Sequence, residues 1–108
     1  MIYQLRIFKD YPGRVEAHIE RFRNHTCPLL EKHGAQIVGL WTCLDDEHKH
    51  QVVFMAAYQD MDAMRAATAA FAADPEQATM VADSEQDGRI IESRENLMLQ
   101  PVDFSPLR

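Results

Sequence analysis

Three side chains in this sequence have the chemistry needed for proton transfer: the carboxylate of Glu95 and the imidazoles of His18 and His25. Glu95 lies in a run of alternating side chains, residues 90–100, and falls in the apolar phase of that run. A carboxylate on an apolar strand face needs a partner, a proton or a ligand, because burial of an isolated charge is costly. Such an environment suits a carboxylate to general acid or base chemistry.

The two histidines are spaced to lie on one side of a helix. His18 and His25 are seven residues apart, which is two helical turns, and both fall along the edge of an apolar stripe. Tyr3 is in the inward phase of the first strand, as Glu95 is in the last. We therefore expect these four side chains to meet under the helix, with Glu95, His18 and His25 in catalytic roles. The alternative is structural: the histidines lie at the helix border, and Glu95 accepts a hydrogen bond from a nearby donor.

Aromatic residues near predicted strand ends are candidates for ligand contacts. Tyr3, Trp41 and Tyr58 can keep their rings packed while their polar atoms reach a ligand, although packing alone would also explain them. Arg6 falls in the opposite phase from Tyr3, on the face without helices. There it is either an anion anchor or part of an interface ion pair. We favour the interface, because buried arginine is usually paired.

No pattern in the sequence predicts a metal or a cofactor. His48 and His50 lie beside acidic residues in the polar connector 44–50, but adjacent side chains on a flexible turn make a poor preorganised metal site. There is no glycine-rich phosphate loop, nucleophile elbow or haem-attachment motif. We therefore predict no metal and no cofactor.

The spacing of apolar residues along the chain predicts the strands and helices that must position these side chains. Period-two patterns indicate strands, and three- to four-residue patterns indicate helices. In chain order they predict a strand ending at the turn 10–13, a helix over 14–33 ended by Gly34, strands over 36–43 and 51–58, a helical region from 60 to Gly88, and a strand over 90–100. Pro28 should bend the first helix or loosen its turn around Asn24. Asp60 and Asp74 are the expected N-caps of two later helices, with Pro75 at the first position of the second.

The order βαββαβ is that of the ferredoxin-like fold, an α+β architecture in which a four-stranded antiparallel sheet carries its helices on one face. The runs 36–43 and 51–58 are apolar in both phases, whereas an antiparallel sheet with one wet face would alternate. We therefore expect a homodimer in which a second sheet covers the bare face, with Arg6 and Phe54 in the interface.

Length and composition predict one soluble domain. Of the 108 residues, 46% are hydrophobic and 26% are charged, and there is no N-terminal signal pattern and no apolar stretch of membrane-spanning length. The formal net charge of −6 argues against nucleic acid and anionic membranes as partners. We expect a cytoplasmic protein with one domain over 1–100 and an extended tail over 101–108, whose Phe104 enters a groove of the other subunit.

Several segments together resemble the NIPSNAP family from end to end. They are Ile-Tyr-Gln-Leu-Arg at 2–6, Pro-Leu-Leu-Glu-Lys-His-Gly at 28–34, Val-Gly-Leu-Trp-Thr at 38–42, Glu-Asn-Leu-Met-Leu-Gln-Pro at 95–101 and Phe-Ser-Pro-Leu at 104–107. The resemblance implies a dimeric α/β barrel, in which two ferredoxin-like sheets form the barrel and a cavity can open between each sheet and its helices. After Asp74-Pro75 this chain has Gln77 and Ala78 where many relatives place a tryptophan, so we expect a differently shaped cavity.

The wider superfamily that this resemblance implies contains cofactor-independent monooxygenases, isomerases, haem-using enzymes and non-catalytic binders. We therefore predict a NIPSNAP-like homodimer, of undefined biochemical role, that binds a small, mainly apolar molecule between sheet and helices. The alternative is a cofactor-independent monooxygenase or isomerase that acts by proton transfer on an aromatic or polyketide-like substrate. A second alternative is a non-catalytic structural interaction module.

Overall fold

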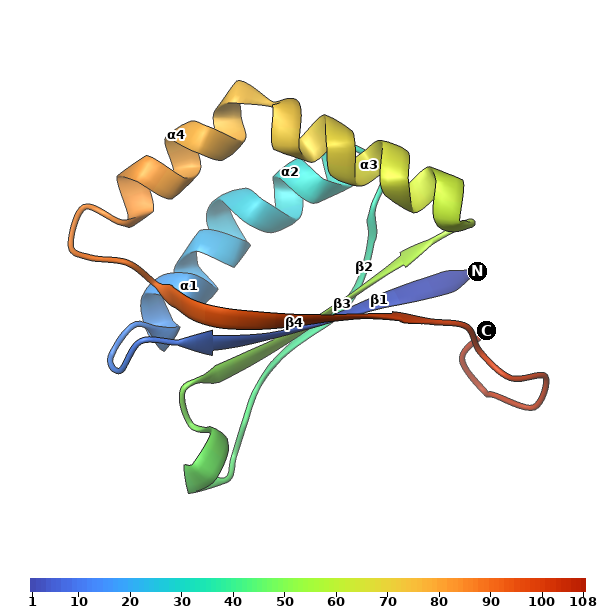
Figure 1. Cartoon of the computed structure of the whole chain (residues 1–108), viewed down its shortest axis with the longest axis horizontal. Coiled ribbons are helices and arrows are strands. Elements are labelled where there is room, and N and C mark those ends of the chain that lie inside the picture. Colours follow the sequence, from blue (N-terminus) through green and yellow to red (C-terminus); the bar gives the residue numbers. More distant parts are fainter.

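The sheet has one face covered by helices and one face without them, here called the open face (Figure 1). The computed structural model describes all 108 residues. The strands pair antiparallel in the order β2-β3-β1-β4, so β1 and β3 are central. Their bounds are β1 Ile2–Asp10, β2 Gln36–Thr42, β3 Gln51–Tyr58 and β4 Ile91–Leu99. The predicted α+β, ferredoxin-like arrangement is confirmed.

The helical segment after β1 is continuous but changes its winding. It consists of α1, Val15–Arg21, a π-helical turn, Phe22–Thr26, and α2, Cys27–Lys32. At the end of the π turn the N–H of Cys27 donates to the carbonyl of Phe22, five residues back. A regular α-helical turn would press the ring of Pro28 against the carbonyl of Asn24, and the wider turn relieves that contact. The predicted loosening around Asn24 is confirmed.

Two aspartates begin the helices that follow β3, as the sequence predicts. These helices are α3, Met61–Ala73, and α4, Pro75–Ser84. The side chain of Asp60 accepts a hydrogen bond from the N–H of Ala63 at 2.8 Å, and that of Asp74 accepts one from the N–H of Glu76 at 2.9 Å. Each carboxylate thus satisfies one of the free donors of a helix N-terminus.

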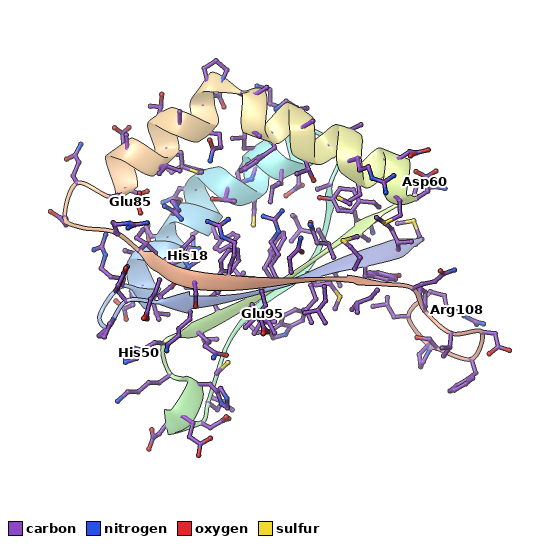
Figure 2. All side chains as sticks on the ribbon, in the orientation of Figure 1. His18, His50, Asp60, Glu85, Glu95 and Arg108 are labelled. Atoms are coloured by element: carbon purple, nitrogen blue, oxygen red, sulfur yellow. The ribbon has the colours of Figure 1, made fainter.

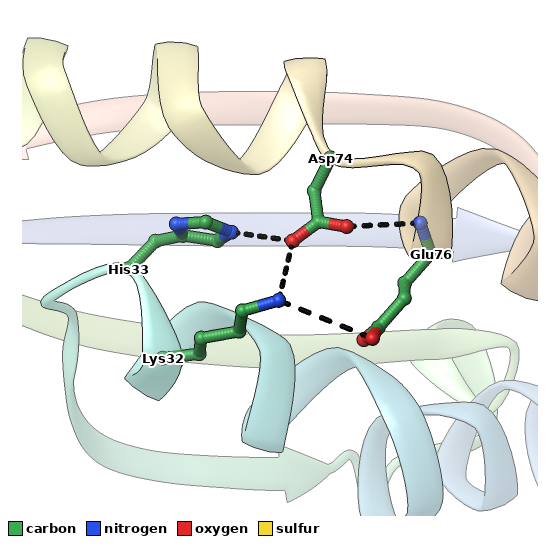
Figure 3. A network of polar contacts seen from close by, with 4 residues as sticks. All are labelled: Lys32, His33, Asp74 and Glu76. Atoms are coloured by element: carbon green, nitrogen blue, oxygen red, sulfur yellow. Dashed lines mark hydrogen bonds and ion pairs between the residues drawn. The ribbon is translucent and has the colours of Figure 1, made fainter.

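Asp74 also ties the end of α2 to the junction of α3 and α4 (Figure 3). Its Oδ2 accepts hydrogen bonds from Nζ of Lys32 at 2.9 Å and from Nε2 of His33 at 2.7 Å. The N–H of Glu76, followed by His33 and Lys32, holds the pKa of Asp74 well below its usual range. One carboxylate therefore joins the ends of three helices.

The core lies between the helices and the covered face of the sheet. Phe54 of β3 is 1% exposed and stacks on Phe22, with ring centroids 5.4 Å apart. Phe8, Val52 and Ala56 are buried in the same cluster. The prediction that Phe54 lies in an interface between two sheets is therefore wrong. Both phases of β3 are apolar, so its pattern does not indicate which phase the helices cover.

A β-bulge in β2 changes which of its side chains share a face. The register with β3 shifts between Ile37 and Gly39, which leaves Val38 as the extra residue. Strict alternation would put Ile37 and Leu40 on opposite faces, yet both pack against the core. Trp41 follows on the open face.

Residues 101–108 leave the end of β4 and fold into a small loop beyond the sheet (Figure 1). The N–H of Ser105 donates to the carbonyl of Val102, and Phe104 at the tip is 83% exposed. The expected docking of Phe104 on another subunit stays a prediction. None of the helices combines the length and the apolar composition that crossing a bilayer requires.

Candidate functional site

A cavity of about 90 Å³ lies between the helical layer and the covered face of the sheet. Eight of its fourteen lining residues are hydrophobic, and Phe8, Phe22, Phe54 and Phe71 supply aromatic wall. The other six are polar: Arg6, His18, Arg21, Thr26, Gln77 and Arg94. The cavity therefore combines an apolar body with a cationic and titratable side.

His18 is held in the cavity wall by a carboxylate from the end of β1. Its Nδ1 lies 2.8 Å from Oδ2 and 3.0 Å from Oδ1 of Asp10, and the two side chains are 2% and 0% exposed. The rings of Phe8 and Phe22 pack against the imidazole, with centroids 4.9 and 4.7 Å away. An ionised carboxylate only accepts hydrogen bonds, so Nδ1 donates to Asp10. Nε2 is then the nitrogen that can exchange a proton with a ligand.

Sequence reasoning missed Asp10, although a signal was present. Asp10 is in the same phase of β1 as Arg6 and Phe8, and this phase faces the helices. A turn through Gly13, which has φ of +80°, brings the start of α1 back over the strand end. A carboxylate at the end of a strand and a histidine in the first turns of the next helix thus become neighbours.

Three guanidinium groups reach the cavity from three different elements. Arg21 of α1 donates to Oγ of Ser84 at 3.1 Å, and the guanidinium of Arg94 lies 5.8 Å from the ring centroid of Phe8. The side chain of Arg6 has neither a hydrogen bond nor an ion pair within the chain, and burial is the main cause that lowers its pKa. Burial also lowers the pKa of Arg21. Arg6 therefore lies under the helices, and the prediction of the bare face for it is wrong.

Glu95 lies on the open face, away from His18, and its predicted position under the helices is wrong (Figure 2). It is paired across the strands with Ile7, which lies in the same phase of β1 as Tyr3, so Glu95 and Tyr3 share a face of the sheet. Its surroundings are a surface hollow that Lys9 and Gln51 also line. Both faces of the sheet carry apolar side chains. The alternation in β4 therefore shows which residues share a face with Glu95, but it does not show whether that face is the one covered by helices.

His25 is exposed and contributes to a surface groove with Asn24 and Met80 rather than to the cavity. The expectation that it faces the sheet together with His18 is wrong. The π turn Phe22–Thr26, which contains His25, has more residues per turn than an α-helix, so a spacing of seven no longer returns to the same side. Of the three predicted catalytic residues, only His18 lies in the cavity wall.

The aromatic residues predicted for ligand contact also lie outside the cavity wall. Tyr58 is 4% exposed in the core, and burial raises its pKa. Tyr3 is buried on the open face opposite Ala57. Trp41 is 47% exposed on that face, with its ring over Gly39. Packing therefore accounts for Tyr3 and Tyr58, and Trp41 is a surface residue of the single chain.

The sequence model of the NIPSNAP family matches residues 3–106, which is nearly the whole chain. The chain belongs to the NIPSNAP family. No curated protein matches the sequence. Gln77, near the start of α4, lies in the cavity wall and therefore helps to shape the cavity.

Solved structures agree with the family assignment. The NIPSNAP-family protein Atu4242 from Agrobacterium tumefaciens is 23% identical, with a TM-score of 0.86 and 100% of each chain covered. An uncharacterised NIPSNAP domain protein from Burkholderia xenovorans is 24% identical over 98% of this chain and 99% of its own, with a TM-score of 0.83. A candidate antibiotic biosynthesis monooxygenase from Nitrosomonas europaea is similar in fold, at 18% identity, 94% and 99% coverage and a TM-score of 0.65.

The chemical capacity of this NIPSNAP site is acid–base and electrostatic. No group of three His, Cys, Asp or Glu side chains is close enough to hold a metal ion. His18 can accept or donate a proton at Nε2, and the arginines can neutralise negative charge on a ligand. The hydrophobic part of the wall lowers the local dielectric constant, which strengthens both effects.

Proposed function

We propose that this NIPSNAP protein binds a small, mainly apolar molecule in the cavity between its sheet and its helices. The observation that supports this is a partly open cavity whose wall combines eight hydrophobic residues with six polar ones, the usual composition of a ligand site. Its volume of about 90 Å³ is less than the roughly 150 Å³ that admits benzene in a rigid apolar cavity. Arg94 is exposed, so its side chain can swing outward to admit a ligand.

The working form that we propose is a homodimer, packed through the open face as a two-sheet barrel. On this face Trp41 and Leu97 are 47% and 42% exposed, and Ile7, Val53 and Met55 are half-buried. Each large apolar side chain removed from water contributes roughly 1.5–3 kcal/mol. A second copy of the chain brings a matching apolar face, since a two-fold interface uses the same surface twice.

The second candidate function is catalysis by proton transfer. The Asp10–His18 pair supports it, because a carboxylate that orients a histidine in a partly apolar cavity is the arrangement of a general base. In this proposal Nε2 of His18 removes a proton from an aromatic or polyketide-like substrate, and the arginines stabilise the resulting anion. The protein would then be a cofactor-independent monooxygenase or an isomerase.

Ligand binding is tested by a fragment screen of the uniformly ¹⁵N-labelled protein by NMR. Neutral aromatic and aliphatic fragments should shift the amides of Phe22 and Arg94 in the wild type. Val81→Phe fills the cavity and should abolish these shifts, whereas Val102→Phe adds the same ring to the exposed tail and should preserve them. Fragments that bind equally to Val81→Phe, or no binding at all, would leave only the structural interaction module.

A further inference from the structure

The cavity has a charge opposite to that of the whole chain. The formal net charge is −6, yet Arg6, Arg21 and Arg94 line the cavity and no aspartate or glutamate does. The nearest buried carboxylate, Asp10, is already hydrogen-bonded to His18. Glu85 and Asp10 act on Arg21 from outside the cavity wall, whereas Arg6 has no ion pair within the chain, so positive charge is in excess in this partly apolar space.

Arg6 and Arg94 are placed to act on the same group. In the pairing of β1 with β4, Arg6 is opposite Asn96 and Phe8 is opposite Arg94, so the two arginines are diagonal neighbours on the covered face. Diagonal neighbours are roughly 7–8 Å apart at the backbone, which long side chains readily span. Arg21 differs from them, because Ser84 already accepts a hydrogen bond from it.

Partial burial makes the charged state of Arg6 less favourable than it would be in water. Burial is the main cause that lowers the pKa of Arg6, and the positive charge of Arg94 lowers it further, while Tyr58 acts in the opposite direction. A buried guanidinium is normally stabilised by hydrogen bonds to an acceptor. An anion between Arg6 and Arg94 would supply the acceptor and cancel the repulsion.

Resting on the ligand-binding function proposed above, we infer that the ligand carries a carboxylate, which Arg6 and Arg94 bind while the apolar part packs against the phenylalanines. A carboxylate is the compact anion that matches the planar donor fork of a guanidinium. The hydrophobic walls then select for an aromatic or short aliphatic body. The ligand class is therefore a small hydrophobic carboxylic acid, and Arg6 is the anion anchor.

The test compares benzoate with benzyl alcohol, which have the same ring and differ in charge, by isothermal titration of the full-length protein. The wild type should bind benzoate at least about tenfold more tightly, the effect of one charge-assisted hydrogen bond. Arg6→Met and Arg94→Gln should each remove most of this preference and retain binding of benzyl alcohol. Arg89→Gln, at an exposed arginine before β4 that does not line the cavity, should keep the preference.

The outcomes separate this inference from the proposed function. Equal affinities for the two compounds in the wild type, or a preference that survives in both cavity variants, would overturn the carboxylate inference and leave ligand binding intact. Failure of both compounds to bind the wild type would overturn ligand binding and the inference together. Arg94 is exposed, so its variant keeps the test decisive even if Arg6→Met unfolds the protein.

Discussion

Oδ2 of Asp10 lies 2.8 Å from Nδ1 of His18, and both side chains are sealed between β1 and α1. The bond joins the end of a central strand to the helix that follows it. It also fixes the ring orientation of the one histidine in the cavity wall. The same contact thus serves folding and the chemistry of the cavity.

Asp10→Ala should therefore reduce the free energy of unfolding by about 1–3 kcal/mol, because it leaves a buried polar ring without its hydrogen-bond partner. Urea denaturation measures the change. Asp103→Ala, in the exposed tail, is the matched control and should stay within about 0.5 kcal/mol of the wild type. A loss below about 1 kcal/mol at Asp10 would contradict the structural importance of the pair.

Asp74 should make the protein sensitive to acid. Its pKa is depressed in the folded state, so the unfolded chain binds more protons in the acidic range, and stability falls as the pH falls. The contribution is complete above the ordinary aspartate pKa of about 3.9 and is lost as the pH passes through the folded-state value. Asn is also a good N-cap, so Asp74→Asn removes the charge and keeps the cap.

The measurement is the free energy of unfolding of the wild type and of Asp74→Asn across the acidic range. The difference between them should be constant at neutral pH and should shrink steadily below about pH 4. Asp87→Asn, at an exposed aspartate without a hydrogen bond to its side chain, should show no such trend. A pH-independent difference would rule out the linkage.

Gly39 is required by the ring of Trp41. A methyl group at position 39 would occupy the space of the indole, so Gly39→Ala should displace the ring, at a cost of less than about 1 kcal/mol because the ring is 47% exposed and can move. Tryptophan fluorescence should shift, because Trp41 is the only tryptophan of the chain. In a Trp41→Ala background the same substitution should cost little, and a full penalty there would refute the ring contact.

The dimer should depend on the open face. Light scattering should give about twice 12.4 kDa for the wild type, and Leu97→Lys should give the monomer, because it places a charge on the apolar face. Ala72→Lys, on the exposed surface of α3, should leave the mass unchanged. Phe54 is unsuitable for this test, since it belongs to the core of one subunit. A monomeric wild type would exclude the barrel.

Deletion of residues 102–108 tests the docking of the tail. Phe104 and Leu107 are 83% and 51% exposed in the single chain, so a partner subunit is needed to bury them. We expect the deletion to lower the thermal midpoint and to shift the mass toward the monomer. Unchanged melting and mass, with fast amide exchange along the intact tail, would mean instead that the segment recruits another protein.

Local signals in the sequence were sufficient to predict where the helices begin and bend. They were not sufficient to predict which face of the sheet the helices cover. The caps at Asp60 and Asp74 and the distortion before Pro28 depend on residues close in the chain, so they were predictable. Which side of β1 the helices cover depends on packing over the whole sheet. The covered phase carries Arg6 and Asp10, whereas the more regularly apolar phase is open. Hydrophobicity alone therefore favoured the wrong side, and the candidate site shifted with it.

The π turn Phe22–Thr26 amounts to one residue more than a regular helix needs. If the same residues wound as an uninterrupted α-helix, with no wide turn to take up the extra residue, every later side chain would be turned by about 100°. Leu29 and Leu30, now 4% and 7% exposed, would rotate away from the core while charged neighbours moved toward it. The π turn thus sets the register of the second half of this helical segment. Without it the same residues would be present, but different ones would face the interior.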